Sequence, residues 1–297
     1  MIRILGTIFA GLFGLAFGSF LNVCLSRWPQ GESIVQPRSH CGHCGRTLTW
    51  WENVPLVSWL ALRGRCRTCR AWIGWRYPLV ELVVGALWAT TAWQSLDPLV
   101  LDHLLYSHSL QVATYIGIST GVGNAVLCWL LVALAAFDAE HFWLPDWITL
   151  PGIGVGFFLV LVRETMIGES GSMKYVAERT ALISIVSILG AAALILLIRW
   201  VYWLIRRREG IGLGDAKLMA LLAAWLGLPG ALLAFVVGVV LGALVALSQL
   251  AIPASRNQSG RWAASKLPLG TFLCIGGIVS SLWGQPILDA YQRWAGF

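Results

Sequence analysis

The sequence predicts an all-α polytopic membrane protein with about eight transmembrane helices and a small zinc-binding insert between the first two. Hydrophobic residues make up 58% of the 297 positions and charged residues only 12%, with a mean hydropathy of +0.73. An average soluble domain carries about 25% charged residues. Several apolar runs also reach the roughly 17 to 25 residues that a bilayer-crossing helix needs. The one sizeable polar block, residues 26–76, contains two pairs of cysteines.

Eight apolar runs are the predicted membrane spans. The first is predicted to be a retained span and not a signal peptide. It lacks a charged n-region followed by a small-residue cleavage site, and "GSFLNVCLSRWP" follows it instead. Residues 97–121 are left outside the count as an interfacial or extramembrane segment, since Asp102, His103 and His108 interrupt them. The predicted spans are 4–25, 77–95, 122–138, 147–163, 180–205, 215–229, 230–252 and 268–286.

The basic residues indicate how the chain is oriented in the membrane. The formal net charge is +7, and arginines concentrate in residues 27–76 and 206–208, with a smaller basic cluster in 256–266. Alternating eight spans from an outside N-terminus puts all three regions on the cytoplasmic side, where membrane proteins carry their excess of Lys and Arg. The positive charge is therefore interpreted as membrane orientation, and a nucleic-acid partner is not expected. We therefore expect a multi-pass membrane protein with these regions on the cytoplasmic side.

The polar block 26–76 is predicted to be a cytoplasmic zinc domain between a first helix, 1–25, and a membrane core, 77–297. Two C-x-x-C pairs separated by 21 residues match a tetrahedral all-cysteine site. A disulfide pair or a redox site is the alternative, which a reducing cytoplasm disfavours. Four cysteine ligands leave no open position for water, so the zinc is expected to be structural. The ligands are Cys41, Cys44, Cys66 and Cys69.

Glu81 lies a few residues inside the second apolar run. A carboxylate within a membrane segment marks a candidate functional site. The alternative is a structural ion pair with Arg76 or another arginine.

Two carboxylates lie in "FDAEHFWLPD", residues 137–146. Asp146 follows Pro145 at the start of a predicted helix, where both residue types are favoured for structural reasons. Asp138 ends a span, where the helix dipole disfavours a negative charge, so its retention points more strongly to chemistry.

The stretch "GLGDAKL", residues 212–218, supplies a second candidate carboxylate, Asp215. It is predicted to start a span on the side at which Asp138 ends one, so that the two can face each other. Two neighbouring carboxylates do not both ionise easily, so one holds a proton while the other activates water. Gly212 and Gly214 are expected to permit positive φ and close approach of a substrate backbone. A local ion pair with Lys217 is the structural alternative for Asp215.

Together these motifs resemble those of the type IV prepilin leader peptidase family, membrane aspartic peptidases of type IV pilus and type II secretion systems. The resemblance spans most of residues 18–219, and the chain beyond residue 220 matches only as apolar spans. The motifs are "GSFLNVCLSRWP", the paired C-x-x-C, "SWLALRGRCRTC", "RYPLVEL", "FDAEHFWLPD" and "GLGDAKL".

The resemblance implies removal of a short basic leader from prepilins and pseudopilins at the cytoplasmic membrane face, with Asp138 and Asp215 as the catalytic pair. Asp146, Lys217 and Glu81 would support the site. Members with the cysteine insert also N-methylate the new terminus with S-adenosylmethionine, and this second activity rests on the resemblance alone. Two other functions stay open from the residues: a proton-coupled transporter with a relay through Glu81, Asp138 and Asp215, and a non-catalytic assembly scaffold.

Overall fold

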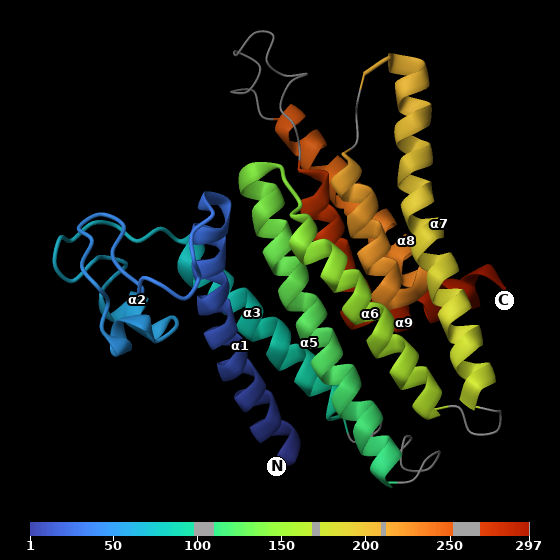
Figure 1. The fold of residues 1–297 in the computed structure, drawn as a ribbon, viewed down its shortest axis with the longest axis horizontal. Coiled ribbons are helices and arrows are strands. Elements are labelled where there is room, and N and C mark those ends of the chain that lie inside the picture. The colour runs from blue at the N-terminus through green and yellow to red at the C-terminus, as the bar shows by residue number, and fades with distance from the viewer. Residues whose placement is uncertain (98–109, 168–172, 209–211, 252–267, 297) are drawn as a thin grey trace. The chain divides into compact units, whose positions relative to one another are not determined.

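The computed structural model describes all residues except 98–109, 168–172, 209–211, 252–267 and 297, and its regular elements are helices (Figure 1). In the described part, β-structure is confined to two isolated bridges, His40 with Thr47 and Arg65 with Trp72. The chain forms two compact units, Met1–Ala133 and Leu134–Phe297.

The first unit is built on two antiparallel helices, α1 (Ile2–Arg27) and α3 (Arg76–Ser95). They approach closely because glycines lie on the facing sides: a Cβ at Gly14 would stand 3.0 Å from the Cα of Gly85, and one at Gly18 would stand 2.7 Å from the Cα of Glu81. Small residues allow membrane helices to pack this tightly. Between α1 and α3 the chain forms the short helices η1 (Trp28–Gln30), η2 (Trp50–Asn53) and α2 (Val57–Ala61).

Helix α5 (Leu110–His141) is longer than the sequence predicted. The predicted span was 122–138, with 97–121 left as an interfacial or extramembrane segment. Residues 110–121 instead form the first three turns of α5, and the membrane-capable segment Tyr115–His141 includes residues 115–121, which the sequence had left outside the spans. These residues are free of the charged side chains and histidines that interrupt the segment earlier, and nothing in them breaks a helix. Residues 98–109, which include Asp102, His103 and His108, lie outside the described part.

The second unit contains the end of α5 followed by α6 (Asp146–Ile167), α7 (Met173–Arg206), α8 (Leu213–Ala251) and α9 (Leu269–Ala295). Residues 164–167 and 173–179, which lie outside the predicted spans 147–163 and 180–205, extend α6 and α7.

Helix α8 is broken at Gly227, whose φ of 68° and ψ of 177° are not helical. Glycine adopts positive φ readily, so it suits such a break. The second half of α8 runs antiparallel to α9, because Ser280 Oγ donates to the carbonyl of Gly230 at 2.8 Å while Gly242 faces Phe272. The first half therefore leads away from the end at which α9 begins, and the second half returns toward it. The break lies close to the boundary that the sequence predicted between spans 215–229 and 230–252.

Six of the described helices are long and apolar enough to cross a membrane. The prediction of a polytopic helical membrane protein is confirmed at this level. The six differ from the predicted eight in two places: α3 is not among them, and Leu213–Gln249 counts as one helix across the break at Gly227.

Candidate active site and metal centre

Asp138 lies in the last turn of α5 and is 7% exposed. Its Oδ2 accepts hydrogen bonds from the backbone N–H of Thr271 at 2.6 Å and from the Thr271 hydroxyl at 3.1 Å. Thr271 belongs to the first turn of α9, where backbone N–H groups have no partner within the helix. The N-terminus of α9 thus holds the Asp138 carboxylate in a fixed orientation.

Gly270 makes this contact possible. A Cβ at this position would stand 2.9 Å from the carboxyl carbon of Asp138 and 3.1 Å from Leu144, so a larger residue would displace the carboxylate. Sequence reasoning missed both Gly270 and Thr271. A signal was available in the sequence, because Pro268 before "LGT" at the start of an apolar run indicates the start of a helix. The free N–H groups at such a start can bind a carboxylate.

Asp215 lies in the first turn of α8 and is 8% exposed. Its Oδ2 accepts a hydrogen bond from the N–H of Gly212 at 3.2 Å, so the side chain folds back over the start of its own helix. Gly214 is helical and is not among the described glycines with positive φ, which corrects the expectation for it. Its small size instead admits Leu144, which would lie 3.2 Å from a Cβ there.

The structure brings Asp138 and Asp215 to one cavity of about 270 Å³. They are close enough for the charge of one to act on the other. The cavity is lined by Asp138, Phe142, Trp143, Leu144, Asp146, Gly212, Gly214, Asp215 and Lys217. Two buried carboxylates facing a shared cavity can act on water as an acid and base pair.

Lys217 does not form the local pair that the sequence suggested. Its Nζ donates to Asp146 Oδ1 at 2.6 Å, joining the second turn of α8 to the first turn of α6. Residues 215 and 217 are two apart on a helix and do not face each other. The structural alternative for Asp215 therefore fails, while Asp146 and Lys217 form an ion pair at the rim of the cavity.

Glu81 belongs to the first unit and is 8% exposed. Its Oε2 accepts the backbone N–H of Leu56 at 2.8 Å. Among the described residues no ion pair to Glu81 is formed, so the expected pairing with an arginine was wrong. The Leu56 N–H supplies the hydrogen-bond donor that a buried carboxylate requires.

The four predicted metal ligands form one cluster, with the sulfur atoms of Cys41, Cys44, Cys66 and Cys69 all within 4.8 Å of one another. A Zn–S bond of about 2.3 Å places tetrahedral sulfurs about 3.8 Å apart, and the Sγ atoms of Cys41 and Cys69 are 3.8 Å apart. Backbone N–H groups of Cys69 and Thr68 lower the pKa of Cys66, which favours the thiolate that a metal binds, while burial and the neighbouring cysteines raise the pKa of Cys69. The cluster could hold zinc.

Both cysteine pairs lie on turns of the same form. The N–H of Cys41 donates to Arg46 and that of Gly45 to Cys41, and Cys66 and Arg70 repeat this pattern. The residue after each pair has positive φ, 70° at Gly45 and 58° at Arg70.

A buried ion pair supports the first of these turns. Arg46 Nη2 contacts Glu52 Oε1 at 2.5 Å, and Glu52 also caps η2 through Thr49. Arg46 and the Thr49 N–H together lower the pKa of Glu52 to about 2, so Glu52 stays charged near neutral pH.

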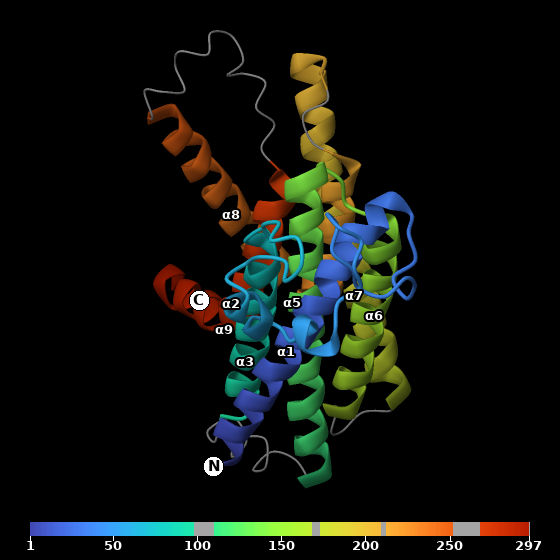
Figure 2. The ribbon, with the colours of Figure 1, turned by 90° about the vertical axis from the view of Figure 1, so that its left-hand side faces the viewer.

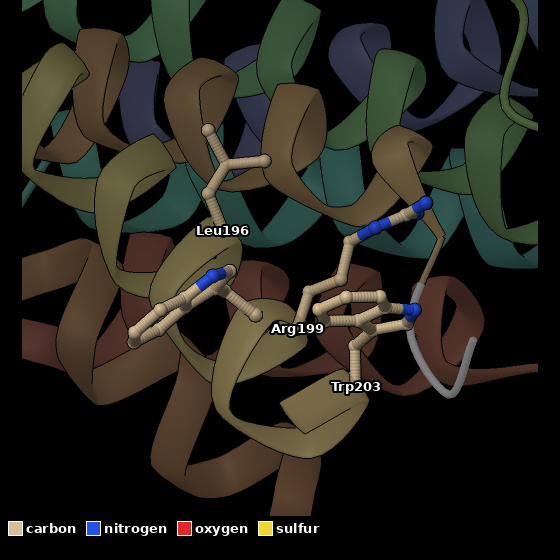
Figure 3. A pocket seen from close by; sticks show the side chains of 4 residues that line it. Leu196, Arg199 and Trp203 are labelled. Carbon is tan, nitrogen blue, oxygen red and sulfur yellow. The ribbon is translucent and has the colours of Figure 1, made fainter. Parts of the chain in front are cut away.

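A second hollow, of about 330 Å³, lies on α7 and is lined by Leu196, Arg199, Trp200 and Trp203 (Figure 3). None of these four lining residues carries a carboxylate, so they offer no counterpart to the aspartate pair.

Comparisons with known proteins cover most of the chain. Residues 125–247 match the model of the Type IV leader peptidase family, and residues 12–95 match the model of the Bacterial Peptidase A24 N-terminal domain. A prepilin leader peptidase/N-methyltransferase of Stutzerimonas stutzeri is 34% identical, over 96% of this chain and 93% of its own length. The protein of that name from Myxococcus xanthus is 38% identical over 88% of this chain and 70% of its own. No solved structure shows significant similarity.

Proposed function

The chain belongs to the type IV leader peptidase family, and from this membership we propose that it removes the leader peptide of type IV prepilins by aspartic hydrolysis at Asp138 and Asp215. The observation that carries the assignment is the shared cavity of the two buried carboxylates. Relatives named prepilin leader peptidase/N-methyltransferase at 31–38% identity support the substrate class.

The hydrogen bonds suggest different roles for the two aspartates. Asp138 accepts two donors from Thr271, and hydrogen bonds to a carboxylate favour its charged form, so we assign it the general base. A water between the carboxylates would give its proton to Asp138 while its oxygen attacks the scissile carbonyl carbon. Protonated Asp215 would donate its proton to the carbonyl oxygen. As the resulting diol collapses, the proton on Asp138 would pass to the leaving nitrogen, a diol hydroxyl would return a proton to Asp215, and the C–N bond would break.

The remaining residues of the site would position these groups. The Asp146–Lys217 pair joins α6 to α8 and would hold the two cavity walls together. Phe142 and Trp143 are 55% and 45% exposed at the cavity, and they would contact the apolar segment that follows the cleaved bond.

Zinc and S-adenosylmethionine enter the proposal differently. The four cysteines would hold a structural zinc that fastens two turns together, as their spacing and the positions of the sulfur atoms support. N-methylation of the new terminus is proposed only because the relatives carry that activity in their names. No described residue is assigned to the methyl donor.

We further propose eight spans with the cavity and the cysteine domain on the cytoplasmic side of the inner membrane. Adding α3 to the six membrane-capable helices and dividing α8 at Gly227 gives this count. The arginines of residues 27–76 favour the cytoplasmic side. Pseudopilins of type II secretion would be substrates along with pilins.

Mass spectrometry of the N-terminus of a co-expressed prepilin tests the function, because it reports leader removal and methylation together. Asp138→Asn and Asp215→Asn should each abolish leader removal while the protein still accumulates in the membrane. Asp146→Asn is the matched control and should retain most of the cleavage. Substantial cleavage by the Asp215→Asn enzyme would refute the assignment, and proton flux in liposomes without cleavage would favour a transporter.

A further inference from the structure

The four-cysteine domain contacts the side of α3, at a point beyond the residue where that helix begins. Glu81 lies five residues beyond Arg76, where α3 begins, and a rise of about 1.5 Å per residue puts it roughly 7 Å along the helix. At this depth it accepts the N–H of Leu56, from the loop that leads into α2. Figures 1 and 2 both show the domain, labelled at α2, alongside α1 and α3 and not beyond their ends.

The domain exposes apolar side chains that a water-facing domain would bury. Val57 and Leu60, three residues apart on one face of α2, are 61% and 67% exposed. Trp72 and Trp75 are also exposed, and they gather around Trp59 with ring centroids 4.4 to 6.0 Å apart. Tryptophan is enriched where a protein meets the membrane–water interface.

The same stretch is strongly basic. Residues 57–76 contain five arginines and no carboxylate. Arg63, Arg65, Arg67 and Arg70 are exposed, and in the described part of the chain none of the four has an ion-pair partner. Residues 28–75 contain six arginines and two glutamates, which gives them a formal net charge of +4. A zinc ion with four thiolates would carry a formal −2, so the domain stays positive with the metal bound.

We propose that the four-cysteine domain docks onto the bilayer that holds α1, with Val57 and Leu60 inserted among the lipids and Arg63, Arg65, Arg67 and Arg70 on anionic phospholipid headgroups. Three observations favour the bilayer as the surface that the domain binds. The domain is tethered on both sides by helices of the membrane unit, it reaches roughly one headgroup depth along α3, and its charge complements an anionic surface. The polar turn Cys41–Cys44, which exposes no apolar side chain, faces water. Glu81 is the positioning residue that holds Leu56 at this depth, which gives this buried carboxylate a role outside hydrolysis.

The test is photo-crosslinking in the full-length protein reconstituted into nanodiscs. A benzophenone amino acid is placed at Leu60, and at His43 as the matched control in the same domain. In discs containing phosphatidylglycerol, the lipid adduct at position 60 should exceed that at position 43 by about tenfold, as expected for side chains inside and outside the headgroup layer. Equal adducts at the two positions would overturn the proposal. So would a prepilin peptide replacing lipid as the main adduct at position 60, since that result would make the surface a substrate site.

Further variants test the Glu81–Leu56 contact and the charge of the four arginines separately. Glu81→Leu removes the acceptor of the Leu56 N–H and should reduce the lipid adduct at position 60 several-fold, whereas Glu81→Gln keeps an acceptor and should retain it. Changing the four exposed arginines to glutamine should remove the difference between phosphatidylglycerol and phosphatidylcholine discs. The zinc content of each variant is measured as a folding control. The proposal is contradicted if Glu81→Leu keeps its metal and an unchanged adduct, or if the arginine variant keeps its metal and still distinguishes the two kinds of disc. The result does not depend on peptidase activity.

Discussion

Replacing Thr271 by valine tests whether the N-terminus of α9 organises the aspartate pair. The hydroxyl of Thr271 is 3.1 Å from Asp138 Oδ2 and 3.1 Å from the carbonyl of Ala135, and its single proton can serve only one of them at a time. A hydrogen bond to a charged group contributes about 1.5 to 3 kcal/mol. The backbone N–H at 2.6 Å stays in the variant, so the lower figure applies, and about 1.4 kcal/mol corresponds to a tenfold rate change. Valine has nearly the shape of threonine and leaves no cavity.

We therefore expect Thr271→Val to lower kcat for leader removal by about tenfold, with KM little changed because Thr271 does not line the cavity. Thr271→Ser keeps the hydroxyl and should stay within about threefold of the parent enzyme. The assay is the initial rate of prepilin cleavage in nanodiscs over a range of substrate concentrations and pH values. If valine and serine reduced kcat equally, the loss would reflect packing of the methyl group. If valine left kcat and its pH profile unchanged, Thr271 would not position Asp138.

Two further predictions concern the rim of the cavity and the cysteine cluster. Lys217→Met should lower cleavage by no more than about fivefold, because a half-exposed ion pair contributes about 0.2 to 1 kcal/mol. Exchanging the charges, with Asp146→Lys and Lys217→Asp together, should recover part of that loss in the same assay, and a double variant worse than both single ones would argue against the pair. Metal analysis of the purified protein should find one zinc per chain, and Cys41→Ser should lose it together with several degrees of Tm. Cys24→Ala, at a buried cysteine outside the cluster, should keep the metal, and full occupancy in Cys41→Ser would refute the metal site.

Local patterns were sufficient for much of the fold. Apolar runs set the helices because a membrane helix satisfies its backbone hydrogen bonds within itself. The break at Gly227 lies close to the boundary predicted between the runs 215–229 and 230–252. The cysteine spacing predicted a cluster that the sulfur positions match. Helix ends were less predictable, as the extra turns of α5 at residues 110–121 show.

The partners of individual side chains could not be read from the sequence. Lys217 contacts Asp146, 71 positions earlier, because a helix directs residues 215 and 217 to different sides. Glu81 contacts a backbone N–H, a group that every residue except proline carries and that no motif can mark. Thr271 lies 133 positions from Asp138, in a region that matched only as an apolar span.

The sequence by itself determined that the chain is a helical membrane protein, and it identified the cysteine cluster and the two candidate aspartates. Composition, length and spacing are properties of short stretches of chain, so no tertiary structure was needed for these conclusions. Only the tertiary structure decided which donors hold each carboxylate, since those donors come from helix ends that meet through packing. Asp138 is bound by the start of α9 and Asp215 by the start of its own helix, and this difference is the basis for giving them different roles.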